Sequence, residues 1–110
     1  IGRSYNDRWL IDRQLNGNVC GARIWDVART QQEVWKNMYD IEDPENEAHL
    51  AAYWKFNEGS GNDIKDYSKY HNDAHIVRYW KDFNSKEEYD VKNEELWPSG
   101  IEVPQVNKED

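Results

Sequence analysis

The stretch 50–61 constrains the fold more than any other part of the chain, because a strand pattern runs directly into a glycine-spaced turn. Its first seven residues, LAAYWKF, alternate with the two-residue period of a β-strand. The alternation gives one face the side chains of Leu50, Ala52, Trp54 and Phe56. The following EGSG segment ends the strand in a turn. Since a face that carries Trp and Phe needs a second layer to cover it, the stretch predicts a layered β fold.

Further strands are predicted on both sides of this stretch. They are two short strands within 1–14, joined by a turn at Asn6-Asp7, and single strands at 19–25, 74–80 and 101–106. Gly21 inside one of them predicts a bulge or a close packing contact. The fold class is therefore mostly β, and we expect a two-sheet antiparallel β-sandwich with one or two short helices. Its core is expected at the inward-facing residues Trp25, Trp54 and Phe56.

Two capping-box patterns predict the short helices. In TQQE, the hydroxyl of Thr30 can accept a hydrogen bond from the Glu33 amide, and the Glu33 carboxylate can reach back to the Thr30 amide. Trp35 is placed to pin this helix to the sandwich, and Pro44 ends the helical region. The SKEE segment at 85–88 predicts one further helical turn.

The charge of the chain excludes one class of partner. Its formal net charge is -8, with 22 acidic and 14 basic residues, and no cluster of Lys and Arg offers a basic face for a nucleic acid. Residues 81–110 form an acidic closing segment with nine acids and four bases. The single Cys20 cannot form a disulfide within the chain. No apolar run is long enough to span a membrane.

Two longer segments carry a family resemblance. Residues 17–30, GNVCGARIWDVART, are followed by Glu33, and residues 52–61, AYWKFNEGSG, are followed by Asp66, Ser68, Asn72 and Asp73. Together they resemble the two hallmark segments of laminin-G-like jelly rolls in the concanavalin A-like lectin and glucanase superfamily. The chain departs from the family where Cys20 and Gly21 replace an acidic pair. The match covers residues 1–80, about half the length of such a domain.

The resemblance implies that residues 1–80 are the C-terminal half of a jelly roll and that 81–110 close it. It also implies a non-catalytic carbohydrate-binding or adhesion module of a larger exported bacterial protein, in the periplasm or on the outer-membrane surface. The implied partners are a glycan or cell-surface polysaccharide and the N-terminal half of the same domain. Two alternatives stay open: a structural or protein-interaction spacer, and a fragment of a glycoside hydrolase whose catalytic acids lie in the other half.

Acidic residues in and after the turn raise the question of a metal site. Asp63, Asp66 and Asp73 carry the oxygen ligands that calcium prefers, but their spacing matches no EF-hand loop. We favour the interpretation that Asp66 and Asp73 accept hydrogen bonds from loop amides, so no cofactor is expected and calcium is the alternative. His71 and His75 have a zinc-like spacing, which we interpret as coincidence because further ligands are missing from the pattern.

The sequence does not predict an enzyme. Glucanases of the superfamily carry a Glu-x-Asp-x-x-Glu run on one strand, and this chain has none. No nucleophile is accompanied by a base and an orienting acid in a recognisable pattern.

Aromatic residues supply the candidate ligand-binding site. Sugar rings stack on flat aromatic side chains, so we select the aromatics expected in or near loops: Tyr5, Trp9, Tyr70 and Trp80. Arg23 lies in the middle of a predicted strand, where an unpaired charge would be costly. We therefore predict that Arg23 pairs with an acid on a neighbouring strand and name Asp66 as that acid.

Overall fold

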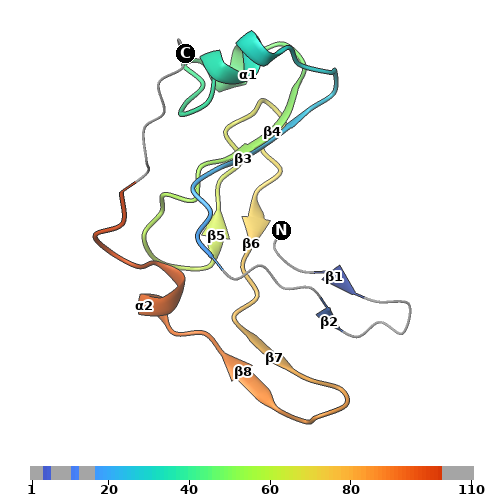
Figure 1. Ribbon diagram of the computed structural model, residues 1–110, viewed down its shortest axis with the longest axis vertical. Coiled ribbons are helices and arrows are strands. Elements are labelled where there is room, and N and C mark those ends of the chain that lie inside the picture. The colour runs from blue at the N-terminus through green and yellow to red at the C-terminus, as the bar shows by residue number, and fades with distance from the viewer. Residues whose placement is uncertain (1–3, 6–10, 13–16, 103–110) are drawn as a thin grey trace.

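The computed structural model of the chain describes residues 4–5, 11–12 and 17–102 (Figure 1). Within these residues, eight short strands form four antiparallel pairs. The pairs are β1 (Ser4–Tyr5) with β2 (Ile11–Asp12), β3 (Ala22–Trp25) with β4 (Leu50–Trp54), β5 (Asp63–Ile64) with β6 (Ala74–His75), and β7 (Tyr79–Lys81) with β8 (Glu88–Asp90). The helical segments are α1 (Gln31–Lys36), the 3-10 helix η1 (Pro44–Asn46) and α2 (Asn93–Leu96).

The prediction of a mostly-β fold with short helices is confirmed. The predicted antiparallel strands near the N-terminus are present as β1 and β2. Each sheet in the described part of the chain has two strands, so the sandwich itself stays a prediction. Figure 1 shows β3 and β4 side by side below α1, while the β7–β8 hairpin lies at the other end of the molecule.

The β3–β4 pair is the longest in the structure. Arg23 lies opposite Tyr53, and Trp25 lies opposite Leu50 after a register irregularity between Ile24 and Trp25. The bulge thus falls three residues beyond Gly21, where the sequence predicted a bulge or a close packing contact. A Cβ atom at Gly21 would lie 3.9 Å from the carbonyl oxygen of Trp54, an ordinary packing distance, so this position does not require glycine.

The buried core differs from the predicted one. Ile41, Leu50 and Tyr53 form a buried cluster, and Trp25 and Tyr67 pack against it while partly exposed. The predicted core residues Trp54 and Phe56 are only half-buried, whereas Tyr53, which the alternation put on the opposite face, is 2% exposed.

Two local causes explain this difference. β4 ends at Trp54, and Phe56 adopts a left-handed backbone conformation with a φ of 54°, so the strand alternation does not continue to Phe56. Tyr53 can be buried because its hydroxyl donates a hydrogen bond to Asp40 Oδ1 at 3.0 Å.

Helix α1 begins as its capping box predicts. Thr30 is the N-cap, and its Oγ1 accepts a hydrogen bond from the Glu33 amide at 3.2 Å. The second predicted contact of the capping box, from the Glu33 carboxylate to the Thr30 amide, is replaced. The Glu33 carboxylate forms an ion pair with Arg29 Nε at 3.2 Å instead. The helix is six residues long, and the half-buried Trp35 is its least exposed side chain.

The helical turn predicted from residues 85–88 is wrong. Glu88 begins β8, which pairs with β7 in a hairpin. The connection is fixed by Asp82, whose carboxylate accepts hydrogen bonds from the amides of Asn84 and Ser85, and by Lys86 with a φ of 62°. A helical turn does occur further on, as α2.

The other predicted strands are partly changed. The strand predicted at 74–80 is divided into β6 and β7. At the predicted edge strand 101–106, Ile101 and Glu102 belong to no strand, and the remaining residues lie outside the described ones.

The small core predicts a large effect for one substitution. Ile41→Ala should lower the free energy of unfolding by about 2–4 kcal/mol, because Ile41 is 2% exposed and packs on Leu50 and Tyr53. Urea unfolding followed by tryptophan fluorescence measures this loss. The control Val34→Ala removes methyl groups from a side chain that is 51% exposed and should change stability by less than about 0.5 kcal/mol. Equal losses in the two variants would contradict the assigned core.

Candidate functional site

A single buried carboxylate organises the loop that follows β5. Asp66 is fully buried and accepts four hydrogen bonds, each at 2.9 Å. The donors are the amides of Tyr53, Ser68 and Asn72 and the hydroxyl of Ser68. The Asp66 amide in turn donates to Asp73 Oδ1 at 2.8 Å. The prediction that Asp66 and Asp73 accept hydrogen bonds from backbone amides is confirmed.

These hydrogen bonds determine the ionisation of Asp66. Burial alone would raise the pKa of this carboxyl, because it disfavours the charged form. The hydrogen bonds from Tyr53, Ser68 and Asn72 favour the charged form more strongly, and the pKa of Asp66 is lowered below its usual value. The buried group is therefore a carboxylate at neutral pH.

The loop that Asp66 holds presents Tyr70 to solvent. Tyr70 is 53% exposed, and its amide donates to Ser68 Oγ at 3.3 Å. Lys69 Nζ lies 5.2 Å from the centroid of the Tyr70 ring. His71 Nε2 lies 3.3 Å from Glu45 Oε1, which ties the loop to η1. An exposed ring on a fixed loop, with the polar side chains of Lys69 and His71 on both sides in the sequence, is suited to contact a ligand.

Of the other three aromatic candidates, Trp80 is the one whose side chain lies among the described residues, and it does not join Tyr70. The side chain of Tyr5 and the whole of Trp9 lie outside the described residues. Trp80 lies on β7 and is half-buried against Tyr89 of β8, with ring centroids 4.9 Å apart and planes at 12°. Figure 1 places this hairpin at the end of the molecule away from α1. The described residues thus leave Tyr70 and Trp80 on separate elements.

The acids weighed as calcium ligands point to different partners. The exposed Asp63 side chain on β5 lies with its Oδ1 3.1 Å from Nδ1 of the exposed His75 on β6, whereas Asp66 and Asp73 accept hydrogen bonds from amides. In the part of the chain that the structure describes, no three His, Cys, Asp or Glu side chains gather as a metal-binding group.

The partner predicted for Arg23 is wrong. Arg23 Nη1 donates to the carbonyl oxygen of Met38 at 3.2 Å, and Nη2 donates to the hydroxyl oxygen of Tyr53 at 3.5 Å. Asp66 instead accepts hydrogen bonds from the amides of Tyr53, Ser68 and Asn72. The Tyr53 hydroxyl in turn donates a hydrogen bond to Asp40 Oδ1 at 3.0 Å. Tyr53 thus links Arg23 to Asp40.

Sequence reasoning missed a group of cations around two tyrosines. Lys55 Nζ and Lys65 Nζ lie 4.5 and 4.6 Å from the ring centroid of Tyr67. The guanidinium of Arg23 lies 4.8 Å from the ring centroid of Tyr53, and the two rings are 6.2 Å apart. We name these five residues the tyrosine–cation patch. The signal in the sequence was that Lys55 and Lys65 flank the predicted turn, but no local pattern shows that both approach the ring of Tyr67.

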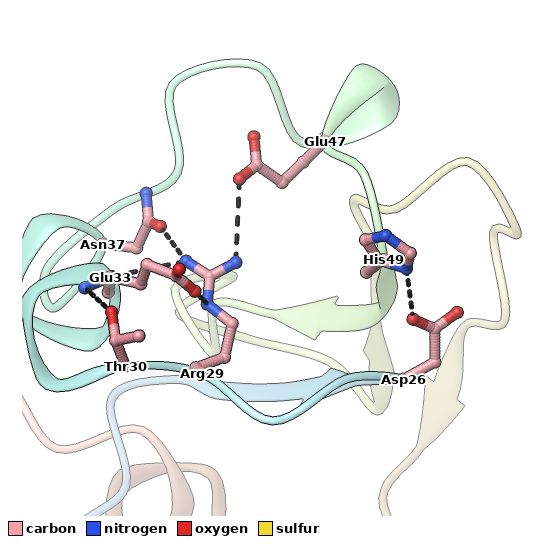
Figure 2. A network of polar contacts seen from close by, with 7 residues as sticks. All are labelled: Asp26, Arg29, Thr30, Glu33, Asn37, Glu47 and His49. Atoms are coloured by element: carbon pink, nitrogen blue, oxygen red, sulfur yellow. Dashed lines mark hydrogen bonds and ion pairs between the residues drawn. The ribbon is translucent and has the colours of Figure 1, made fainter.

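A second network surrounds Arg29 and joins β3, α1 and η1 (Figure 2). The Arg29 guanidinium lies 3.6 Å from the ring centroid of Trp25, and its Nη2 donates to Asn37 Oδ1 at 2.7 Å. Its Nη1 lies 4.0 Å from Glu47 Oε1. Figure 2 also shows His49 beside Asp26, with Nδ1 and Oδ1 2.8 Å apart. These contacts hold the helix and the η1 segment against the strands, so we assign them a structural role.

Comparison with known proteins gives no match among protein-family models, curated proteins or solved structures. The resemblance to laminin-G-like domains therefore stays a prediction. None of the described helices is both long enough and apolar enough to pass through a bilayer.

The Arg29 network predicts that lysine cannot replace this arginine. Arg29→Lys keeps the positive charge but loses the planar group that stacks on Trp25 and bonds Asn37. We expect a loss of about 1–3 kcal/mol in unfolding free energy by urea titration. The control Lys92→Gln breaks an exposed ion pair with Asp90 and should cost less than about 1 kcal/mol. A fully stable Arg29→Lys variant would refute the structural role of the network.

The ionised state of Asp66 predicts a pH dependence of stability. The folded pKa lies below the ordinary 3.8, so the stabilisation is complete above that value and is lost as the pH falls through the folded pKa. Asp66→Asn removes an acceptor and places an amide group among donors, which should cost at least about 3 kcal/mol at pH 7. Urea unfolding is measured at several values between about pH 2 and pH 7. The unfolding free energy of the variant should fall less steeply than that of the original protein as the pH is lowered. An unchanged slope would show that Asp66 is not the group responsible.

Proposed function

We propose that this chain is part of a laminin-G-like β-sandwich that serves as a non-catalytic carbohydrate-binding or adhesion module of an exported bacterial protein. The observation that carries the proposal is Tyr70, an exposed ring on a loop that the buried Asp66 fixes through four hydrogen bonds. The family resemblance of the sequence supports the setting: a larger protein of the periplasm or the outer-membrane surface.

Ring stacking is the binding mechanism that fits Tyr70. The C–H face of a sugar ring can pack on the exposed tyrosine ring, while its hydroxyl groups need polar neighbours. Lys69 and His71 flank Tyr70 in the sequence, and Asn72 follows on the same loop. Because the loop is already fixed in the free protein, little conformational entropy would be lost when a sugar binds.

A specific feature of the sheet favours a second candidate, in which the chain completes a larger domain by strand addition. One edge of β4 is closed: the Tyr53 amide donates to Asp66 Oδ1 at 2.9 Å, and Tyr67 donates its amide to the Tyr53 carbonyl at 2.8 Å. β3 has β4 as its only strand neighbour among the described residues, and Ile24 on β3 is 52% exposed. A strand from the N-terminal half of the domain could pair with this edge and cover Ile24. In that case the domain would be a structural or protein-interaction spacer.

The stacking proposal is tested by changing Tyr70. Tyr70→Ala should weaken glycan binding at least about tenfold, or about 1.4 kcal/mol, because the stacking surface is lost. Tyr70→Phe keeps the ring and should retain most of the affinity. Binding is measured by glycan array to find a ligand and then by isothermal titration calorimetry.

The matched control is Phe83→Ala, which removes an aromatic ring that is 75% exposed on the β7–β8 connection. If Phe83→Ala weakens binding as much as Tyr70→Ala, the loop site is wrong. If the folded protein binds no glycan on the array, the spacer function is favoured instead.

A further inference from the structure

The β7–β8 hairpin offers an edge at which another strand can be added. β8 is the only strand that pairs with β7 among the described residues, and neither strand contains a buried side chain. Figure 1 shows the hairpin extending away from the β3–β4 pair. A two-stranded hairpin alone is at best marginally stable in water, and further strands on its edge stabilise it. The outer edge of β7 is therefore a surface on which a partner strand would be favourable.

The hydrogen bonds of the hairpin show which backbone groups of β7 point outwards. Val91 donates its amide to the Arg78 carbonyl at 3.0 Å, so these two residues form a hydrogen-bonded pair. Hydrogen-bonded and non-hydrogen-bonded pairs alternate along an antiparallel ladder, and this alternation assigns Tyr79 and Lys81 to non-hydrogen-bonded pairs with β8. The N–H and C=O groups of Tyr79 and Lys81 therefore point away from β8 and line the outer edge of β7.

We propose that two copies of this chain pair through this edge, with their β7 strands antiparallel and a two-fold axis at Trp80. The result is a closed dimer in which two hairpins of two strands form one four-stranded sheet. In this register Tyr79 of each copy lies opposite Lys81 of the other. Because both residues carry outward-pointing backbone groups, each such pair can exchange both of its backbone hydrogen bonds. The inference goes beyond the proposed function and does not depend on it, because Tyr70 lies on a separate loop.

The side chains in this register are complementary on both faces of the sheet. On one face, the Lys81 ammonium of one copy would lie beside the Tyr79 ring of the other, which is 55% exposed and can attract a cation. On the other face, Trp80 already stacks on Tyr89 with ring centroids 4.9 Å apart. The two-fold axis would bring two such aromatic pairs together in one row, and cross-strand aromatic pairs stabilise antiparallel sheets.

Charge disfavours two other symmetric arrangements. Pairing through the outer edge of β8 around Tyr89 would place Glu88 of each copy opposite Asp90 of the other, and like charges that face each other destabilise a sheet. A β7 pairing centred on Lys81 would place one lysine directly against the other. The register centred on Trp80 avoids both conflicts.

The size of the edge predicts a weak dimer. β7 is three residues long, so the pairing buries far less surface than the about 800 Å² per partner of a standard interface. Each copy also carries a net charge of -8, and the repulsion between exposed charges is screened beyond about 8 Å at physiological salt. We therefore expect association at high protein concentration and physiological salt.

The test is sedimentation velocity on the full chain over a series of concentrations at physiological salt. We expect a reversible equilibrium between monomer and dimer. Tyr79→Lys should raise the dissociation constant of the dimer at least tenfold, because the dimer would then hold two pairs of facing lysines. The hairpin is retained in this variant, since the new ammonium lies opposite Asp90 of its own β8. The matched control Tyr70→Lys makes the same change on a separate exposed ring and should leave the dissociation constant unchanged.

Two results of the sedimentation experiment contradict the closed dimer. A chain that stays monomeric at every concentration would overturn it, and so would growth beyond a dimer, which open-ended pairing of β7 with β8 of the next copy would give. Equal weakening by Tyr79→Lys and Tyr70→Lys would show a general effect of charge and overturn the assigned edge.

An engineered disulfide locates the two-fold axis. In the background Cys20→Ser, which removes the exposed free cysteine, Trp80→Cys places two thiols across the axis. The Cα atoms of such a non-hydrogen-bonded pair are about 4.5 Å apart, within the range of a disulfide, so mild oxidation should give a covalent dimer on a non-reducing gel. In the matched control Tyr89→Cys, the two thiols would lie three strand spacings apart, about 14 Å, and should not join. Equal crosslinking in the two variants, or none with Trp80→Cys, would overturn the register.

Discussion

The rest of the described structure depends on the hydrogen bonds that the buried Asp66 carboxylate accepts. It accepts the amide hydrogen of Tyr53 at the edge of β4, where another strand would otherwise supply a carbonyl oxygen. The same carboxylate accepts the amides of Ser68 and Asn72, so one side chain closes a strand edge and fixes a loop. A buried carboxylate is stable only when such donors surround it, and each donor here belongs to the segment that it positions.

Tyr53 shows how burial and electrostatics are combined in this small sheet. Its ring belongs to the apolar cluster with Ile41 and Leu50, while its hydroxyl accepts from Arg23 and donates to Asp40. The pKa of Asp40 is lowered: burial raises it, but the hydrogen bond from Tyr53 and the charge of Lys55 outweigh that effect. Asp40 therefore remains charged at neutral pH and offsets one of the cations of the patch.

The predictions that held depend on neighbours in the sequence. The Thr30 cap contacts a residue three positions away, and the turn-like contact of Asp66 with Ser68 spans two. The predictions that failed depend on distant partners. The burial of Tyr53 requires an acid thirteen residues away, and the SKEE pattern gives way to pairing with β7. The pairing of Arg23 was misassigned because a strand pattern tells which face a residue occupies only once its register and its ends are known.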